Sequence, residues 1–240
     1  MPDWTFPPQR TSWLFVSKSG ETLETVSQIL IVLKWLEATI GKAGISERCV
    51  VVTEPKPSAL TTLAKHYNMP SYAHDPALGG RWSCISNVGM LPAASCGLDI
   101  RAFREGTKVM LHHALNAPIA ENMPLQGALY GVRQAARGRN THVIMPYIDQ
   151  LEKTASWCRQ LISESLGKQG KGITPLAALG TVDQHSMLQL LLDGTDNKYF
   201  TVIVTEQNGK GDIIPADLAE LCGISYIGGK PLGNILSAFQ

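Results

Sequence analysis

The sequence of 240 residues contains few of the features that mark secreted, membrane or metal-binding proteins. Its five cysteines are scattered, with no C-x-x-C pair and no histidine nearby at metal-ligand spacing. Reduced thiols in the cytoplasm fit this pattern best, and a structural zinc site is not expected. Hydrophobic runs such as residues 29–33 are far too short to cross a bilayer. The sequence therefore predicts a soluble, cytoplasmic protein with no membrane partner.

An excess of charge of one sign is also missing. Lys and Arg number 21 and Asp and Glu number 20, so no basic surface is expected to hold nucleic acid. Any phosphate must then be held by a local site. Residues 1–10 contain three prolines and lack the hydrophobic segment of a secretory signal. No G-x-G-x-x-G, Walker loop or metal-ligand cluster occurs, so we expect neither a cofactor nor a metal.

One stretch near the N-terminus combines a strand, a turn of small residues and a helix. The hydrophobic residues 13–16 predict a buried strand, and residues of a helix-period pattern follow: Val26, Ile29, Leu30, Leu33 and Leu36. The turn between them contains Ser17, Lys18, Ser19, Gly20 and Thr22. Because a helix N-terminus offers free N–H groups and the positive end of the dipole, this turn suits an anion. From the residue types alone, a capped helix is an equal alternative.

Strand-like runs alternate with helix-like segments along the whole chain. Strands are predicted at residues 49–53, 141–147, 199–204 and 224–227, and Gly41 and Gly44 are expected to end the first helix. This alternation predicts an α/β protein with parallel sheets sandwiched by helices. The polar, basic segment 131–140 is interpreted as the join between two halves, giving domains 1–135 and 136–240.

Two further segments contain side chains suited to acid–base chemistry on an anion. Arg81 follows Gly79 and Gly80, so a fixed positive charge can approach a ligand closely and stabilise an oxyanion. Gln160 and Glu164 are four residues apart on a predicted helix and share a face with an indole and a leucine. Partial desolvation there suits a general base. Taken singly, a surface arginine and a solvated glutamate are the more common outcomes.

The segment 180–186 adds a histidine at the start of a helix. Thr181 and Gln184 fit a capping box, which places His185 in the first turn. The helix dipole disfavours the charged imidazolium there, and a neutral ring can pass a proton in either direction. An anion loop, a fixed cation, a base and a proton shuttle together suit proton abstraction beside the carbonyl of a phosphorylated sugar.

At these residues the sequence resembles the phosphoglucose isomerase family. The resemblance rests on four ordered motifs: SKSGETLET at 17–25, GGRWSCISNVGMLP at 79–92, RQLISESLGK at 159–168 and GITPLAALGTVDQHSMLQL at 172–190. It implies two flavodoxin-like sugar-isomerase (SIS) domains, each a three-layer α/β/α sandwich. It also implies cofactor-free interconversion of glucose 6-phosphate and fructose 6-phosphate in glycolysis and gluconeogenesis, through a cis-enediolate.

The resemblance assigns a role to each matching position. Glu164 matches the base that moves the proton, Arg81 the residue that stabilises the enediolate, and His185 the ring-opening residue supplied by a neighbouring subunit. A homodimer is therefore implied. The substrate-binding positions are Ser17, Lys18, Ser19, Thr22, Gly80 and Gln160.

The chain departs from the family pattern at both ends. Family members are longer, and no segment here matches the family's earlier glycine-serine loop or its C-terminal catalytic lysine. We expect the chain to be an isomerase of this family or the central part of one. The alternatives are a sugar-phosphate-binding module without turnover and a segment of a larger polypeptide, such as a transaldolase fusion.

Overall fold

The computed structural model describes residues 7–240 and divides into two compact units, Met1–His112 and His113–Gln240. Each unit contains a three-stranded sheet in which every pairing is parallel. The predicted α/β class with parallel sheets is confirmed. The prediction that residues 1–10 form no signal concerns, in part, residues outside the described range. The domain boundary at residue 135 stays a prediction.

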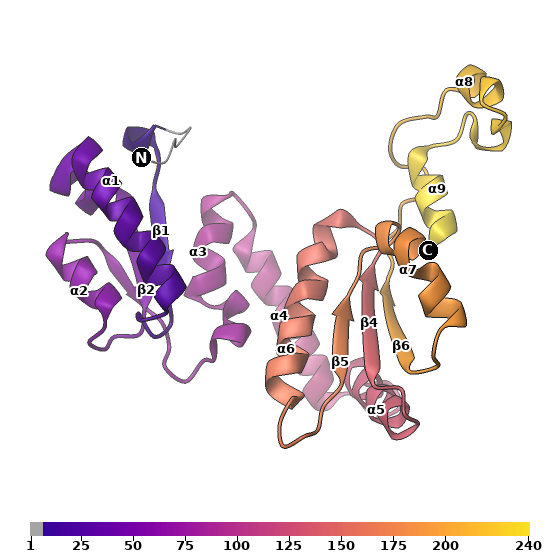
Figure 1. Ribbon diagram of the computed structural model, residues 1–240, viewed down its shortest axis with the longest axis horizontal. Coiled ribbons are helices and arrows are strands. Elements are labelled where there is room, and N and C mark those ends of the chain that lie inside the picture. The colour runs from indigo at the N-terminus through magenta and orange to yellow at the C-terminus, as the bar shows by residue number, and fades with distance from the viewer. Residues whose placement is uncertain (1–6) are drawn as a thin grey trace. The chain divides into compact units, whose positions relative to one another are not determined.

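The first unit has the strand order β1-β2-β3, and Figure 1 shows α1 and α2 beside these strands. The chain reaches the first sheet through a short 3-10 helix, η1 (Pro8–Arg10). The elements that follow are β1 (Trp13–Val16), α1 (Leu23–Arg48), β2 (Cys49–Thr53), α2 (Ala59–His66), β3 (Ser71–Ala73), the 3-10 helix η2 (Gly80–Ile85), α3 (Asn87–Ser95) and α4 (Ile100–Asn116), which crosses the division between the units.

The core of the first unit lies where α1 and α2 pack against the sheet. The buried stripe of α1 consists of Ile29, Val32, Leu33 and Leu36, which follow the helix period. The prediction that Leu30 belongs to this stripe is wrong, since its side chain is 50% exposed. Leu30 follows the buried Ile29 by one residue, so the turn of the helix points its side chain away from the stripe. Val32 occupies an inward position instead.

The first helix is broken at Gly41, as the sequence indicates, but the prediction that Gly44 also ends it is wrong. Gly41 interrupts the helix with φ 67° and ψ 178°, and helical turns then resume as far as Arg48. A positive φ is easily reached only by glycine, which explains the residue at this break. The change of direction lets the last turns bury Ile45 and deliver the chain directly into β2.

The second unit has the strand order β5-β4-β6, seen side by side in Figure 1. The elements of this unit are α5 (Met123–Ala136), β4 (Thr141–Pro146), η3 (Asp149–Leu151), α6 (Glu152–Leu166), β5 (Thr174–Ala177), α7 (Val182–Asp193), β6 (Lys198–Ile203), α8 (Ala216–Leu221), η4 (Ser225–Ile227) and α9 (Leu232–Phe239). The sequence interpretation missed one strand in each unit, β3 and β5.

Helices cover both faces of the second sheet. Val143 packs in a cluster with Leu191 of α7 and Leu236 of α9. His142, on the opposite face because successive strand residues alternate, stacks on Tyr199, which in turn contacts Tyr130 of α5 edge to face. The sheet is therefore the middle layer of a three-layer arrangement.

The segment 131–140, predicted as the join between two halves, is helical in its first part, because α5 continues through Gly131 to Ala136. A Cβ at Gly131 would lie 3.2 Å from the hydroxyl of Tyr199, so glycine here permits close packing of α5 on the sheet. The strand predicted at 224–227 is wrong. The Ile224 N–H donates to Ala219 O and the Gly228 N–H to Ser225 O, so these amides bond locally next to α8.

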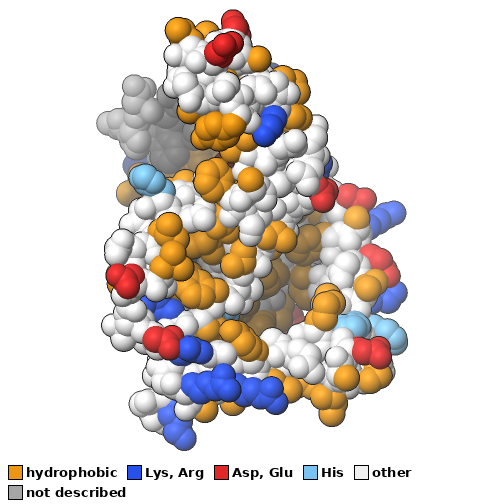
Figure 2. Space-filling view, turned by 90° about the vertical axis from the view of Figure 1, so that its right-hand side faces the viewer, with side chains coloured by type: hydrophobic (Ala, Val, Ile, Leu, Met, Phe, Trp, Pro, Cys, Tyr) orange, Lys and Arg blue, Asp and Glu red, His pale blue; other side chains and the backbone are white. Residues whose placement is uncertain are grey.

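The strand β6, at one edge of the second sheet, is partly uncovered on one face within the described chain. Phe200 and Val202 of the edge strand β6 are exposed, as is Leu192 of α7. Figure 2 looks at this side of the molecule and shows hydrophobic side chains gathered on it. Among the helices of residues 7–240, none is both long and hydrophobic enough to cross a membrane.

Candidate functional site

The turn predicted to bind an anion lies between the end of β1 and the start of α1. Ser17 is buried, and its Oγ accepts a hydrogen bond from the Gly20 N–H at 3.1 Å and lies 3.1 Å from Thr22 Oγ1. Ser19 Oγ accepts from the Glu21 N–H at 3.1 Å. Thr22 is the N-cap residue of α1, yet its side chain makes no capping hydrogen bond. The N–H groups in the first turn of α1 therefore donate no hydrogen bond to the N-cap side chain, which favours anion binding there.

The turn is held in place by the first turn of α2. Gly20 has φ 70°, and a Cβ there would lie 2.2 Å from Ser58 Oγ. Ser58 in turn forms a capping box with Thr61, and the Leu60 N–H donates to Gly20 O at 3.0 Å. Both the backbone conformation and the close approach require glycine at position 20.

Lys18 has several partners inside the first unit. Its Nζ donates to the carbonyl oxygens of Pro76 at 3.2 Å and Leu78 at 2.9 Å, and it lies 3.5 Å from Glu54 Oε1. The second oxygen of the buried Glu54 carboxyl lies 2.5 Å from Lys56 Nζ. The hydrogen bond from Lys56, with the charge of both lysines, holds the pKa of Glu54 below its ordinary value. The predicted place of Lys18 in the anion loop stays a prediction.

Gly80 and Arg81 begin η2, directly after the turn that Lys18 contacts. The guanidinium carbon of Arg81 lies 5.8 Å from the centre of the Trp82 ring, within the range of a cation–π contact. Ser83 Oγ donates to Gly80 O at 2.6 Å and stabilises the first turn of η2. Gly80 is exposed, and a Cβ there would meet nothing within 4 Å, so packing does not require glycine at this position.

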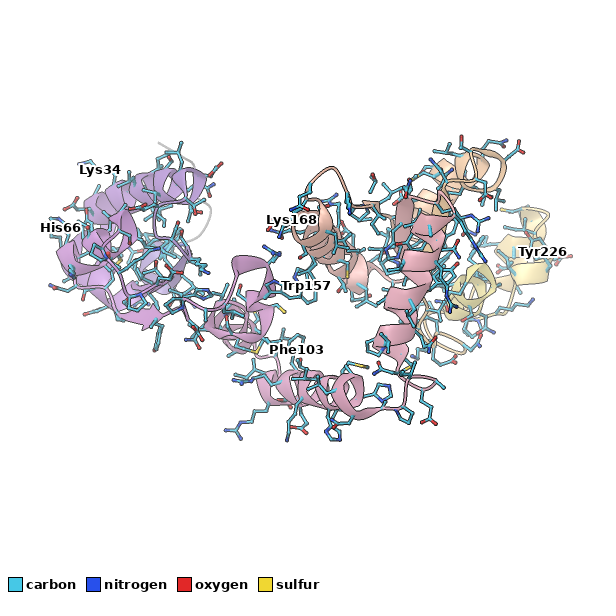
Figure 3. All side chains as sticks on the ribbon, turned by 90° about the horizontal axis from the view of Figure 1, so that it is seen from below. Lys34, His66, Phe103, Trp157, Lys168 and Tyr226 are labelled. Atoms are coloured by element: carbon cyan, nitrogen blue, oxygen red, sulfur yellow. The ribbon has the colours of Figure 1, made fainter. Side chains whose placement is uncertain are left out.

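Gln160 and Glu164 share one face of α6, as the sequence predicted. Gln160 Nε2 donates to Glu164 Oε1 at 2.8 Å, and both side chains are exposed. Trp157, labelled in Figure 3, projects from the same helix and lines an open groove with them. The carboxylate and its amide partner are therefore accessible from solvent and oriented by one another.

His185 lies in the first turn of α7, but the predicted capping box is absent. Thr181 makes no side-chain capping bond; Asp183 Oδ2 instead accepts from the Leu179 N–H at 2.7 Å. The correction has a local cause, since Thr181 has helical φ and ψ (−91°, −12°) rather than the extended backbone that N-cap residues adopt. His185 itself is exposed.

Glu164 and His185 lie toward opposite ends of the second sheet. The helix α6 begins where β4 ends and runs back along the strands, so Glu164 is about 18 Å along the axis from Glu152, at about 1.5 Å per residue. The helix α7 begins at the edge where β5 ends, and His185 is in its first turn. Within one chain, these two side chains are well separated along the strand direction.

Sequence reasoning missed two buried polar residues beside the anion loop, Glu54 and His74. Each directly follows a strand of the first sheet, β2 and β3, and the carboxyl ends of parallel strands share one edge. That position was the available signal. Among residues 7–240, no group of three or more His, Cys, Asp or Glu side chains could hold a metal ion.

The fold and these residues define an α/β protein with a small-residue turn at a helix N-terminus in one parallel-sheet unit and a Gln–Glu pair in the other. A family model described as "Phosphoglucose isomerase" matches residues 5–214. The chain therefore belongs to the phosphoglucose isomerase family.

Individual relatives agree with this assignment. A glucose-6-phosphate isomerase of Rubrobacter xylanophilus is 38% identical over 231 residues, covering 96% of this chain and 53% of that protein. A probable glucose-6-phosphate isomerase of Natronomonas pharaonis is 38% identical over 226 residues, covering 93% and 50%. The crystal structure of a hypothetical protein from Thermus thermophilus superposes with a TM-score of 0.88 at 36% identity, covering 98% and 56%. The chain thus spans about half the length of the curated relatives it matches.

Proposed function

We propose that this chain carries catalytic residues of a glucose-6-phosphate isomerase, which interconverts glucose 6-phosphate and fructose 6-phosphate through a cis-enediolate. The observation that carries the proposal is the Gln160–Glu164 pair on an open face of α6, in a chain of this family. An accessible carboxylate with one oxygen held by an amide is suited to receive a proton from carbon.

In the proposed reaction, Glu164 removes the proton from C2 of the open-chain aldose. The electron pair of the broken C–H bond forms the C1–C2 double bond of the enediolate, while the carbonyl electron pair moves to O1. Return of the proton to C1, together with transfer of the hydroxyl proton from O2 to O1, re-forms a carbonyl at C2 and gives the ketose. Arg81 is proposed to stabilise the negative charge on the enediolate oxygens, where a guanidinium can act on two neighbouring oxygens. The proton moves within the substrate, so the step requires no redox partner.

The phosphoryl group is proposed to bind at the turn formed by Ser17, Lys18, Ser19 and Thr22, with Gly80 and Gln160 as further contacts to the sugar phosphate. The internal hydrogen bonds of Ser17 and Gly20 support this part of the proposal, because they order the turn without a ligand. A preorganised anion site loses less conformational entropy on binding.

His185 is proposed to open the sugar ring in the site of a second copy of the chain, within a homodimer. The separation of Glu164 and His185 along the second sheet supports this arrangement, because one hexose phosphate is too small to contact both in a single chain. We also propose a cytoplasmic location, in keeping with the five cysteines, all of them free thiols in the structure.

Glu164→Gln tests the proposal, with Glu220→Gln on the exposed face of α8 as the matched control. Loss of a general base is expected to lower turnover by about 10²- to 10⁴-fold, while affinity for the sugar phosphate changes little. Turnover is measured with an assay coupled to removal of glucose 6-phosphate. Full turnover by the Glu164→Gln variant would contradict the assignment of the base, and binding without turnover by the unaltered chain would support the alternative of a binding module.

A further inference from the structure

The turn that precedes Arg81 is clamped from two sides. It closes on itself, since the Leu78 N–H donates to Asp75 O at 3.0 Å and the Ala77 N–H to Asp75 Oδ1 at 2.9 Å. Lys18 Nζ reaches it from the anion loop and bonds the carbonyl oxygens of Pro76 and Leu78. A lysine side chain from the first strand's end thus holds the segment that follows the third strand.

The carbonyl of Leu78 has both of its lone pairs occupied. It accepts from Lys18 Nζ at 2.9 Å and from His74 Nε2 at 3.0 Å. Because a carbonyl oxygen only accepts, the ring of His74 must carry its proton on Nε2. His74 is 1% exposed, and its backbone N–H donates to Thr53 O at 2.8 Å. His74, the second donor to Leu78 O, is therefore fixed to the sheet.

Glu54 fixes Lys18, the first donor to Leu78 O. Its carboxyl is buried at the end of β2, and its backbone N–H donates to Lys18 O at 3.1 Å while its side chain pairs with Lys18 Nζ. The main chain and the side chain of Lys18 are therefore both bound to the same residue. This leaves the ammonium directed at the turn, one residue before Gly79 and three before Arg81.

We propose that Glu54, Lys18 and His74 form a clamp that positions Arg81 relative to the anion loop, with Glu54 and His74 as positioning residues. The proposal rests on the function proposed above. In it, Lys18 contributes main-chain atoms to the anion loop, while its ammonium holds the Asp75–Leu78 turn. Binding of the phosphoryl group and stabilisation of the enediolate are thereby linked through one rigid connection, which keeps the guanidinium at the place where negative charge develops.

Lys18→Met tests the clamp, because methionine keeps a flexible stem and removes the donors. Lys56→Met is the matched control: both lysines pair with Glu54, but only Lys18 bonds the turn. Lys18→Arg is the conservative variant. The measurements on the full chain are hydrogen exchange of residues 79–86, affinity for inorganic phosphate, and kcat and KM for isomerisation.

The clamp predicts exchange that is faster by about tenfold at residues 79–86 in Lys18→Met, with phosphate affinity within about threefold and neither changed in Lys56→Met. It further predicts that kcat falls by about tenfold or more while KM is little changed, with partial recovery in Lys18→Arg. In an Arg81→Ala background, Lys18→Met should then have little further effect on kcat.

Unchanged exchange at residues 79–86 in Lys18→Met would overturn the clamp. A large loss of phosphate affinity with kcat intact would also overturn it, and would make Lys18 a direct ligand of the phosphoryl group. If the unaltered chain shows no turnover, the proposed function fails by itself. The exchange and phosphate measurements still decide whether the clamp exists, since neither depends on catalysis.

Discussion

The two units present their candidate site residues in different ways. In the first, the anion loop is bonded internally and rests on buried polar groups, among them Ser17, Glu54 and His74. In the second, Gln160, Glu164 and His185 are exposed on helix surfaces. Among the described residues, the buried hydrophobic cluster of the first unit, which includes Leu33, Leu36 and Ile45, is also larger than the cluster around Val143 in the second.

This difference separates binding from chemistry. A loop that is ordered by its own hydrogen bonds can receive a phosphoryl group without rearranging, which favours affinity. Side chains on an open helix face are hydrated, so a carboxylate there becomes an effective base only when the substrate excludes water. In the proposed function, the first unit therefore offers a preformed site for the phosphoryl group, whereas the second supplies reactive groups whose basicity depends on the substrate that covers them.

The largest expected effect is a loss of unfolding free energy on truncation of a core side chain in the first unit. Leu36→Ala removes a fully buried side chain of α1 and should lower the free energy of unfolding by about 2–5 kcal/mol. Leu30→Ala, on the outer face of the same helix, should cost less than about 1 kcal/mol. Urea unfolding measures both, and hydrogen exchange assigns the loss to a unit. Equal destabilisation of the second unit would show that the two cores are not independent.

A smaller effect concerns the rigidity of the anion loop. Gly20→Ala introduces a Cβ 2.2 Å from Ser58 Oγ at a positive φ and should cost about 1–3 kcal/mol, with weaker phosphate binding. Gly80→Ala, where a Cβ meets nothing within 4 Å, should change stability by less than about 0.5 kcal/mol. Urea unfolding and phosphate titration give both values. If Gly20→Ala proves as mild as Gly80→Ala, the loop is not preformed.

The smallest effect is a pH dependence in the second unit. His142 stacks on Tyr199 with 4.4 Å between ring centres, and burial lowers the pKa of His142 below its ordinary value. Between the lowered pKa and about 6.5, the unfolded chain binds a proton that the folded chain does not, so stability falls as pH falls through this window.

His142→Gln should remove this part of the pH dependence, and His112→Gln, an exposed change on α4, should leave it in place. Urea midpoints at about pH 7 and about pH 5.5 provide the comparison. A slope that persists in His142→Gln would assign the titration to other groups.

Local patterns in the sequence by themselves determined the fold class and the position of several candidate site residues. The alternation of strand and helix periods predicted parallel α/β structure, because buried parallel strands and amphipathic helices leave clear hydrophobic patterns. The i, i+4 spacing predicted that Gln160 and Glu164 lie side by side, since the helix period alone brings such residues together. The order strand, small turn and helix likewise located the loop of Ser17 and Thr22.

Only the tertiary structure decided what depends on neighbours distant in the sequence. Gly131 proved to be a packing residue inside α5, because a Cβ there would meet the hydroxyl of Tyr199 from the second sheet. Lys18 meets Leu78 across the ends of β1 and β3, and no local pattern encodes that approach. Hydrophobic period is a property of neighbouring residues, whereas the partner of a buried charge is set by which strand ends the sheet brings together.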